Sequence, residues 1–148
     1  MLTMKVFRVI ESLHLPDRKQ RRLPFVVISI IYSMTAYLYA YPAIRIHFDE
    51  KFLHTFFGIC ASLVVLTIIT FFYKISAHTL AISGVFGGML AMAIRYHEVV
   101  LAIPLAVTAV CVGIVMAARL SLKAHSLQEV LWACAVGFTL NFIIIFFA

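Results

Sequence analysis

Five long runs without a charged residue divide the sequence, and all of its charges lie in the short segments between and before them. The runs are 19 to 22 residues long, which matches the roughly 20 residues that an α-helix needs to cross the hydrocarbon core of a bilayer. None of them alternates between apolar and polar residues as a barrel strand does. The pattern therefore predicts an all-α, polytopic membrane helix bundle with about five transmembrane helices, at 23–44, 52–73, 75–94, 99–118 and 130–148.

The first 22 residues form the polar beginning of the chain. Between positions 4 and 15, apolar residues recur at the spacing of one helix face with charged residues between them, which is typical of a helix lying in the membrane interface. A basic stretch at 18–22 follows, and it is suited either to a plain positive anchor or to an anion site. We therefore expect a single membrane domain over 1–148, with an interfacial amphipathic segment at 1–22 and a transmembrane bundle at 23–148.

The composition narrows the classes of protein to which the chain can belong. Hydrophobic residues make up 64% of the sequence and charged residues 12%, whereas a globular domain has about 25% charged residues. The mean hydropathy is +1.07. These values exclude a cytosolic enzyme, a secreted disulfide scaffold and a disordered tail, and they indicate an integral membrane protein.

Cysteine usage and net charge limit the expected cofactors and partners. The cysteines lie inside predicted spans without metal-binding spacing, at Cys60, Cys111 and Cys134, so we interpret them as small packing residues. No disulfide framework, metal or cofactor is expected. The net charge of +6 is compatible with nucleic acid binding, but a chain with so little polar surface is a poor fit to that partner. An anionic lipid headgroup in the bilayer is the expected partner instead.

Three polar clusters are predicted to share one face of the membrane. Two spans lie between the stretch 18–22 and the loop 74–78, and two more lie between that loop and the segment 119–129. Because each pair of spans returns the chain to the side that it left, all three clusters face the same side, together with nine of the twelve cations. The excess of positive charge favours the cytoplasm for this face.

The cations and a serine of this face suit an anion site. Lys74 and Arg119 are fixed positive charges, and Ser76 begins the third span, where backbone N–H groups and the helix dipole favour a phosphate. Such a clamp stabilises the negative oxygens of a phosphoryl group during transfer. The simpler alternative is that each cation anchors its helix at the membrane interface.

Two histidines and a carboxylate add the groups that phosphoryl transfer needs. His125 and Glu129 are four residues apart at the start of the fifth span and therefore lie on one helix face. A carboxylate in this position can accept the imidazole N–H and leave the other ring nitrogen to attack phosphorus. His78 is suited to donate a proton to the leaving alkoxide. Each histidine alone would more simply be a hydrogen-bonding partner at a helix end.

Two stretches of the chain resemble motifs of a known family. The segment 74–78, K-I-S-A-H, resembles the motif P-S-G-H, and the segment 118–129 resembles the motif S-R-x5-H-x3-D, with the same spacing from arginine to histidine and from histidine to acid. Both motifs belong to the type 2 phosphatidic acid phosphatase superfamily, whose site is similar to that of vanadate-binding haloperoxidases. The chain looks most like short bacterial members, which implies a protein of the bacterial inner membrane.

The resemblance implies a role for each matching residue. His125 would be the nucleophile, Glu129 would orient it, and His78 would protonate the leaving group, while Ser76 and Arg119 would hold the phosphate. The family works without a metal and typically removes phosphate from membrane lipid phosphates or pyrophosphates through a phosphohistidine intermediate. The implied activity is that of a lipid phosphate or pyrophosphate hydrolase.

The chain departs from the family pattern at several positions. Ile75 and Ala77 replace the proline and glycine of the first stretch, Ala118 replaces a serine, and Glu129 replaces an aspartate. The motif K-x6-R-P, which precedes these two in the family, has no clean match. Arginines of the basic stretch precede Pro24 with a different spacing, and the phosphate-clamp role is carried onto two of them, Arg18 and Arg22.

Two other readings remain open from the sequence. The departures allow a catalytically inactive relative that serves as a lipid-binding or assembly subunit. The six histidines also raise the possibility of a haem-binding bundle, but haem sites need histidines that face each other within the bilayer. The histidines of this chain cluster near the helix ends instead.

Overall fold

The computed structural model describes residues 18–42 and 48–147 as a bundle of long helices. Positions 1–17 of the predicted interfacial segment lie outside the described residues. The five long helices follow one another in the order α2 (Arg18–Ala40), α4 (Glu50–Phe72), α5 (Ala77–Arg95), α6 (Ala102–Ser121) and α7 (Leu127–Phe147), and a short 3-10 turn, η1 (Val99–Leu101), precedes α6. The described part contains no strand, and all five helices are long and apolar enough to span a membrane. The expected all-α membrane bundle is therefore confirmed.

The helix ends differ from the predicted spans because helices continue into their charged flanks. α2 begins at Arg18, so the basic stretch is its first turn and not part of a separate segment. Pro24 lies inside α2. α7 begins at Leu127, three residues before the uncharged run starts. A charge therefore marks where a span leaves the hydrocarbon, and it does not mark where the helix ends.

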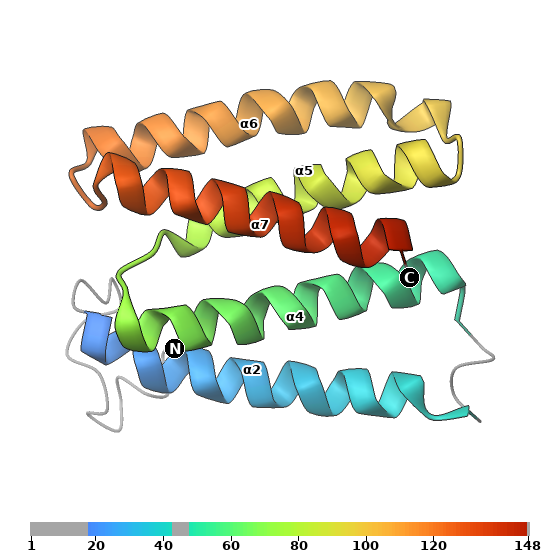
Figure 1. The fold of residues 1–148 in the computed structure, drawn as a ribbon, viewed down its shortest axis with the longest axis horizontal. Coiled ribbons are helices and arrows are strands. Elements are labelled where there is room, and N and C mark those ends of the chain that lie inside the picture. Colours follow the sequence, from blue (N-terminus) through green and yellow to red (C-terminus); the bar gives the residue numbers. More distant parts are fainter. Residues whose placement is uncertain (1–17, 43–47, 148) are drawn as a thin grey trace.

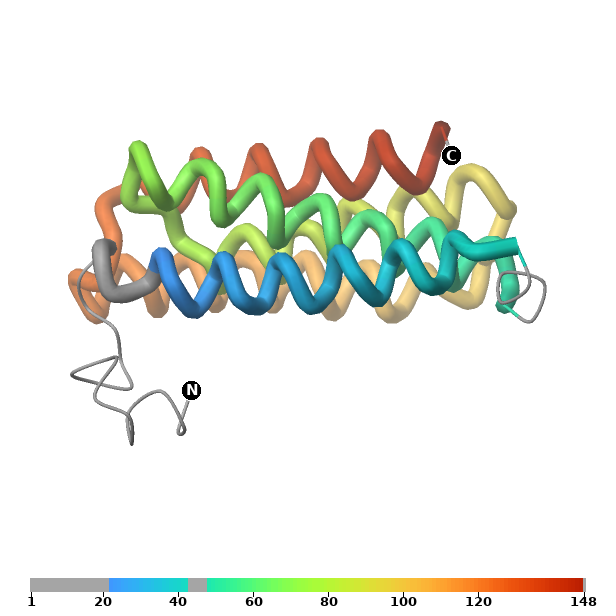
Figure 2. Tube along the Cα trace, turned by 90° about the horizontal axis from the view of Figure 1, so that it is seen from below, coloured from blue at the N-terminus to red at the C-terminus, as the bar shows by residue number. Residues whose placement is uncertain are grey.

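The helices alternate in direction along the chain, so that each connection between two helices lies at the opposite end of the bundle from the connection before it (Figure 1). The start of α2, the loop between α4 and α5 and the turn between α6 and α7 lie at one end, which we call the motif end. α5 and α7 run in the same direction and cross closely, α4 and α6 flank them on either side, and α2 packs against the outer side of α4 (Figure 1). Figure 2 shows α7 along one face of the bundle, with α2 and α6 displaced toward the other.

Glycines allow the close crossing of α5 and α7. A Cβ atom built on Gly137 would overlap the backbone oxygen of Leu80 and lie 2.5 Å from Ser83 Oγ. A Cβ atom on Gly87 would overlap the backbone oxygen of Phe138. Close approach at small residues is how membrane helices gain van der Waals packing, because lipid removes the hydrophobic drive between them. The contact between these two helices is the most extensive in the bundle.

Polar contacts also join helices within the apolar bundle. The hydroxyls of Ser29 and Thr67 lie 2.7 Å apart and link α2 to α4. At the end opposite the motif end, Arg95 Nη1 donates to the backbone oxygens of Ile145 at 2.9 Å and Phe146 at 3.1 Å, at the end of α7. α6 has no buried residue, so its surface is the most exposed to lipid among the described helices.

Candidate functional site

α5 begins at a serine cap. Ser76 has an extended backbone (φ −81°, ψ 101°), and its Oγ accepts a hydrogen bond from the backbone N–H of Thr79 at 3.4 Å. The two hydroxyls of Ser76 and Thr79 also lie 2.9 Å apart. Ser76 is fully buried. Its hydroxyl therefore stabilises the first turn of α5, in the position where a helix N-terminus would also attract an anion.

α7 begins with a reciprocal cap made by Ser126 and Glu129. The backbone N–H of Glu129 donates to Ser126 Oγ at 3.3 Å, and the backbone N–H of Ser126 donates to Glu129 Oε2 at 3.3 Å. This is the capping-box arrangement, in which serine at the N-cap and glutamate three residues later satisfy two backbone donors. The cap holds the glutamate carboxylate against the preceding turn of the chain.

The same carboxylate oxygen contacts the ring of His125. His125 Nδ1 lies 2.7 Å from Glu129 Oε2. Because a carboxylate only accepts hydrogen bonds, the proton of the ring is assigned to Nδ1, and Nε2 is the nitrogen that Glu129 does not engage. The side chain of His125 is 3% exposed and that of Glu129 is 15% exposed. The pair is thus oriented and mostly shielded from solvent.

Two arginines at the motif end carry buried donors without an acceptor. Arg22 Nη2 donates to the backbone oxygen of Phe71 at 2.9 Å, at the end of α4, and its guanidinium lies 5.1 Å from the centre of the Phe71 ring. Arg119 lies in the last turn of α6. The Nε atoms of Arg22 and Arg119 are both buried and have no hydrogen-bond partner among the described residues. A buried unsatisfied donor on a cation is costly, so both positions favour an anionic acceptor.

The remaining predicted site residues lie at the same end of the bundle. Lys74 is half-buried in the loop between α4 and α5, and His78 is exposed in the first turn of α5. Arg18 is the first residue of α2, and only its place in the backbone is described. Within the described residues, neither Lys74 nor Arg119 forms an ion pair with Glu129. His125 and Glu129 are in direct side-chain contact.

Two features of the structure were missed in the sequence. The spacing S-x-x-E at 126–129 is a capping-box signal, and it would have identified the role of Ser126 at the start of α7. Asn141 lies deep in α7 and is buried. A lone amide inside an apolar span is itself a signal of function or of specific packing.

Comparison with known proteins finds no family model, curated protein or solved structure that matches this chain. Among the described residues, no group of three or more His, Cys, Asp or Glu side chains is placed to hold a metal ion.

Proposed function

We propose that this protein is a metal-independent phosphatase of the bacterial inner membrane, which removes phosphate from a membrane lipid phosphate or pyrophosphate through a phosphohistidine intermediate. The observation that carries the proposal is the 2.7 Å contact of His125 Nδ1 with Glu129 Oε2. It supplies a nucleophile whose tautomer and ring orientation are set by a carboxylate. The resemblance of the segments 74–78 and 118–129 to the type 2 phosphatidic acid phosphatase motifs supports the same assignment.

The proposed reaction has two steps. His125 Nε2 attacks phosphorus, the bond from phosphorus to the lipid oxygen breaks, and His78 donates a proton to the leaving alkoxide. Water then attacks the phosphohistidine while His78, now neutral, accepts its proton, and phosphate leaves as Nε2 is restored. The Glu129 carboxylate stabilises the positive charge that the His125 ring acquires in the first step.

The cations of the motif end hold the phosphoryl group in this proposal. The unsatisfied Nε atoms of Arg119 and Arg22 supply donors that phosphate oxygens can satisfy. Lys74 and the start of α5 at Ser76 add positive potential. Arg18 lies one turn before Arg22 on α2 and adds a further positive charge to that end of the helix.

Phosphate release by the purified protein tests this proposal. Phosphatidic acid, phosphatidylglycerol phosphate and a polyprenyl pyrophosphate are supplied in mixed micelles, and wild type is compared with His125→Ala. We expect release from at least one substrate and a loss of about 10³-fold or more in His125→Ala, as for the removal of other catalytic nucleophiles.

A histidine outside the motifs provides the matched control for this assay. His97 is exposed in the turn at the opposite end of the bundle and has a positive φ of 52°, which asparagine tolerates. His97→Asn is expected to retain wild-type release. Absence of release from all three substrates, or equal release by His125→Ala, would contradict the proposed activity.

The burial of His125 favours a second candidate function. The ring is 3% exposed, and the hydroxyl of Ser76 is engaged by its own helix turn. A lipid-binding or assembly subunit without turnover would retain the cations of the motif end with the ring covered in this way. Catalysis instead requires the groups that cover the ring to move aside. Binding of phosphatidic acid or vanadate without phosphate release would support the second function, and measurable hydrolysis would exclude it.

We also propose that the motif end faces the cytoplasm, because seven of the twelve cations lie in its described segments. In a cysteine-free background, Ser121→Cys places an exposed thiol at the motif end, and Val99→Cys places one at the opposite end. A membrane-impermeant maleimide applied to intact cells is expected to label Val99→Cys and to label Ser121→Cys only after lysis. Labelling of Ser121→Cys in intact cells would place the site on the other side.

A further inference from the structure

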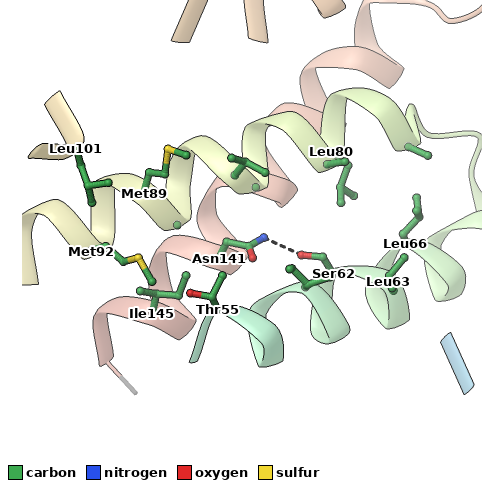
Figure 3. Close-up of a pocket in the computed structure, with 16 residues that line it drawn as sticks. Thr55, Ser62, Leu63, Leu66, Leu80, Met89, Met92, Leu101, Asn141 and Ile145 are labelled. Atoms are coloured by element: carbon green, nitrogen blue, oxygen red, sulfur yellow. Dashed lines mark hydrogen bonds between the residues drawn. The ribbon is translucent and has the colours of Figure 1, made fainter. Parts of the chain in front are cut away.

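A cavity of about 510 Å³ lies between α4 and α5, with α7 as its floor (Figure 3). Its volume falls within the range of small-molecule sites, roughly 300–1,000 Å³. Residues on its two rims are exposed to the surroundings of the bundle, Ile59 on α4 by 43% and Val85 on α5 by 46%. The cavity therefore opens sideways, where lipid chains surround the spans.

Small residues on α5 create this space. Ala77, Ala81, Gly84 and Gly88 line the cavity at spacings of four, three and four residues, which places them on one helix face. The lining extends along α5 from Ala77 to Met92, a distance of about 22 Å at 1.5 Å per residue. The shape is a long groove, suited to one extended chain.

The groove contains one pair of polar side chains that bond each other, while a third, Thr55, donates to the backbone oxygen of Lys51 in its own helix at 2.7 Å. Asn141 on α7 is 6% exposed, and its Nδ2 donates to Ser62 Oγ at 2.7 Å and to the backbone oxygen of Gly137 at 3.0 Å (Figure 3). The bond to a carbonyl oxygen identifies this atom as the amide nitrogen, so Oδ1 is the remaining acceptor. Oδ1 receives no hydrogen bond from the described residues, and Asn141 and Ser62 both line the cavity.

Both members of this pair have unused hydrogen-bonding capacity. Asn141 Oδ1 is an acceptor without a described donor, and the hydroxyl hydrogen of Ser62 has no described acceptor. An unsatisfied polar group inside the hydrocarbon costs several kcal/mol, of the order of that for transfer to an apolar solvent. One acceptor beside one donor is the complement of a hydroxyl group, which donates one hydrogen bond and accepts others.

We infer that this groove binds a membrane-soluble alcohol with a single hydrocarbon chain, whose hydroxyl lies between Asn141 and Ser62 and whose chain lies against the small residues of α5. The described lining includes no charged residue, so a carboxylate or an amine would be buried without a counter-ion. An alkane would leave the polar pair unsatisfied. Neither objection applies to an alcohol.

The inference stands apart from the proposed phosphatase function. Gly84, which lies against Asn141, is eight residues from the cap at Ser76, or about 12 Å along the helix. None of the residues assigned to phosphoryl transfer lines the groove. The alcohol can therefore bind whether or not the motif end hydrolyses phosphate.

Competition between an alcohol and its alkane tests the inference on the wild-type protein. A diazirine-bearing hexadecanol is crosslinked to the purified protein in nanodiscs, and unlabelled hexadecanol, hexadecane or hexadecylamine is added as competitor. We expect label on peptides of α4, α5 and α7 that line the groove, and displacement by hexadecanol at about five- to tenfold lower concentration than by hexadecane, as one or two intramembrane hydrogen bonds provide. Hexadecylamine is expected to compete no better than hexadecane.

Two substitutions distinguish binding in the groove from binding on the lipid-facing surface of the bundle. Asn141→Leu retains the approximate size of the side chain and removes the acceptor, so the preference for alcohol over alkane should disappear. Ala109→Leu lies on the exposed surface of α6 and does not line the groove, so it should retain the preference. Equal displacement by hexadecanol and hexadecane, or label confined to α6, would overturn the inference even if Asn141→Leu does not fold. A cavity that holds only water would give the same equal displacement.

Discussion

Replacing Gly137 by leucine is expected to separate α5 from α7 and to leave the chain without a stable bundle. The first atom of the new side chain would overlap the backbone oxygen of Leu80 and lie 2.5 Å from Ser83 Oγ. Backbone atoms of a neighbouring helix cannot change rotamer to make room, so the helices must move apart. Overpacking typically costs about 1–3 kcal/mol and occasionally more. We expect a cost above about 3 kcal/mol here because the most extensive contact of the bundle is affected.

Gly113 is the matched control, because no heavy atom lies within 4 Å of a Cβ atom built on it. Gly113→Leu places the same side chain on the exposed surface of α6, and it should leave stability unchanged or raise it by up to about 1 kcal/mol through helix propensity. Thermal unfolding and size-exclusion profiles in the same detergent compare the two variants. A Gly137→Leu protein as stable as wild type would show that α5 and α7 do not cross at this glycine.

Replacing Glu129 by glutamine is expected to lower phosphate release by about 10²- to 10⁴-fold, as for neutralisation of a histidine-orienting carboxylate in other enzymes, while the start of α7 is retained. Glutamine also serves at the third position of a capping box, so the contacts with Ser126 can persist. The substitution removes the negative charge that lies 2.7 Å from His125 Nδ1. The His125 ring then loses stabilisation of the positive charge that it acquires on attack.

Ser126→Ala is the reverse test, because it removes the helix cap and keeps the carboxylate. It removes the hydroxyl that accepts from the backbone of Glu129 at 3.3 Å and leaves the carboxylate beside the histidine. We expect a loss of about 1 kcal/mol in stability, as for other N-cap serines, with phosphate release close to that of wild type. If Ser126→Ala and Glu129→Gln reduce release equally, the carboxylate acts through the helix cap and not through the histidine.

The features predicted correctly from the sequence are those that depend on local geometry. A run of about 20 uncharged residues must form a helix in the bilayer, because no water is present to satisfy its backbone groups. The contact of His125 with Glu129 is also local, but His125 precedes α7, so the reciprocal cap of Ser126 and Glu129, and not a shared helix face, brings the two side chains together. The common end of the three polar clusters follows from the number of spans between them (Figure 1).

The helix ends were less accurately predicted, because the predicted spans stop at the first charged residue on each side. α2 starts at Arg18 and carries Pro24 within it, since the backbone bonds of a helix persist where its side chains already reach the headgroups. A helix continues wherever its backbone hydrogen bonds form, whereas a charged side chain lies where it can reach the headgroups. The same reason places Glu129 inside the first turn of α7.

The sequence by itself determined the number and direction of the spans, because hydrophobic length is a property of each span alone, and it placed an imidazole and a carboxylate four residues apart at the start of α7. Only the tertiary structure decided which glycines carry the crossing of α5 and α7, that Arg22 reaches the end of α4, and that Asn141 meets Ser62 beside an open groove. These features depend on the relative register of helices that lie far apart along the chain. In a bilayer that register is set by side-chain packing, which hydropathy does not encode.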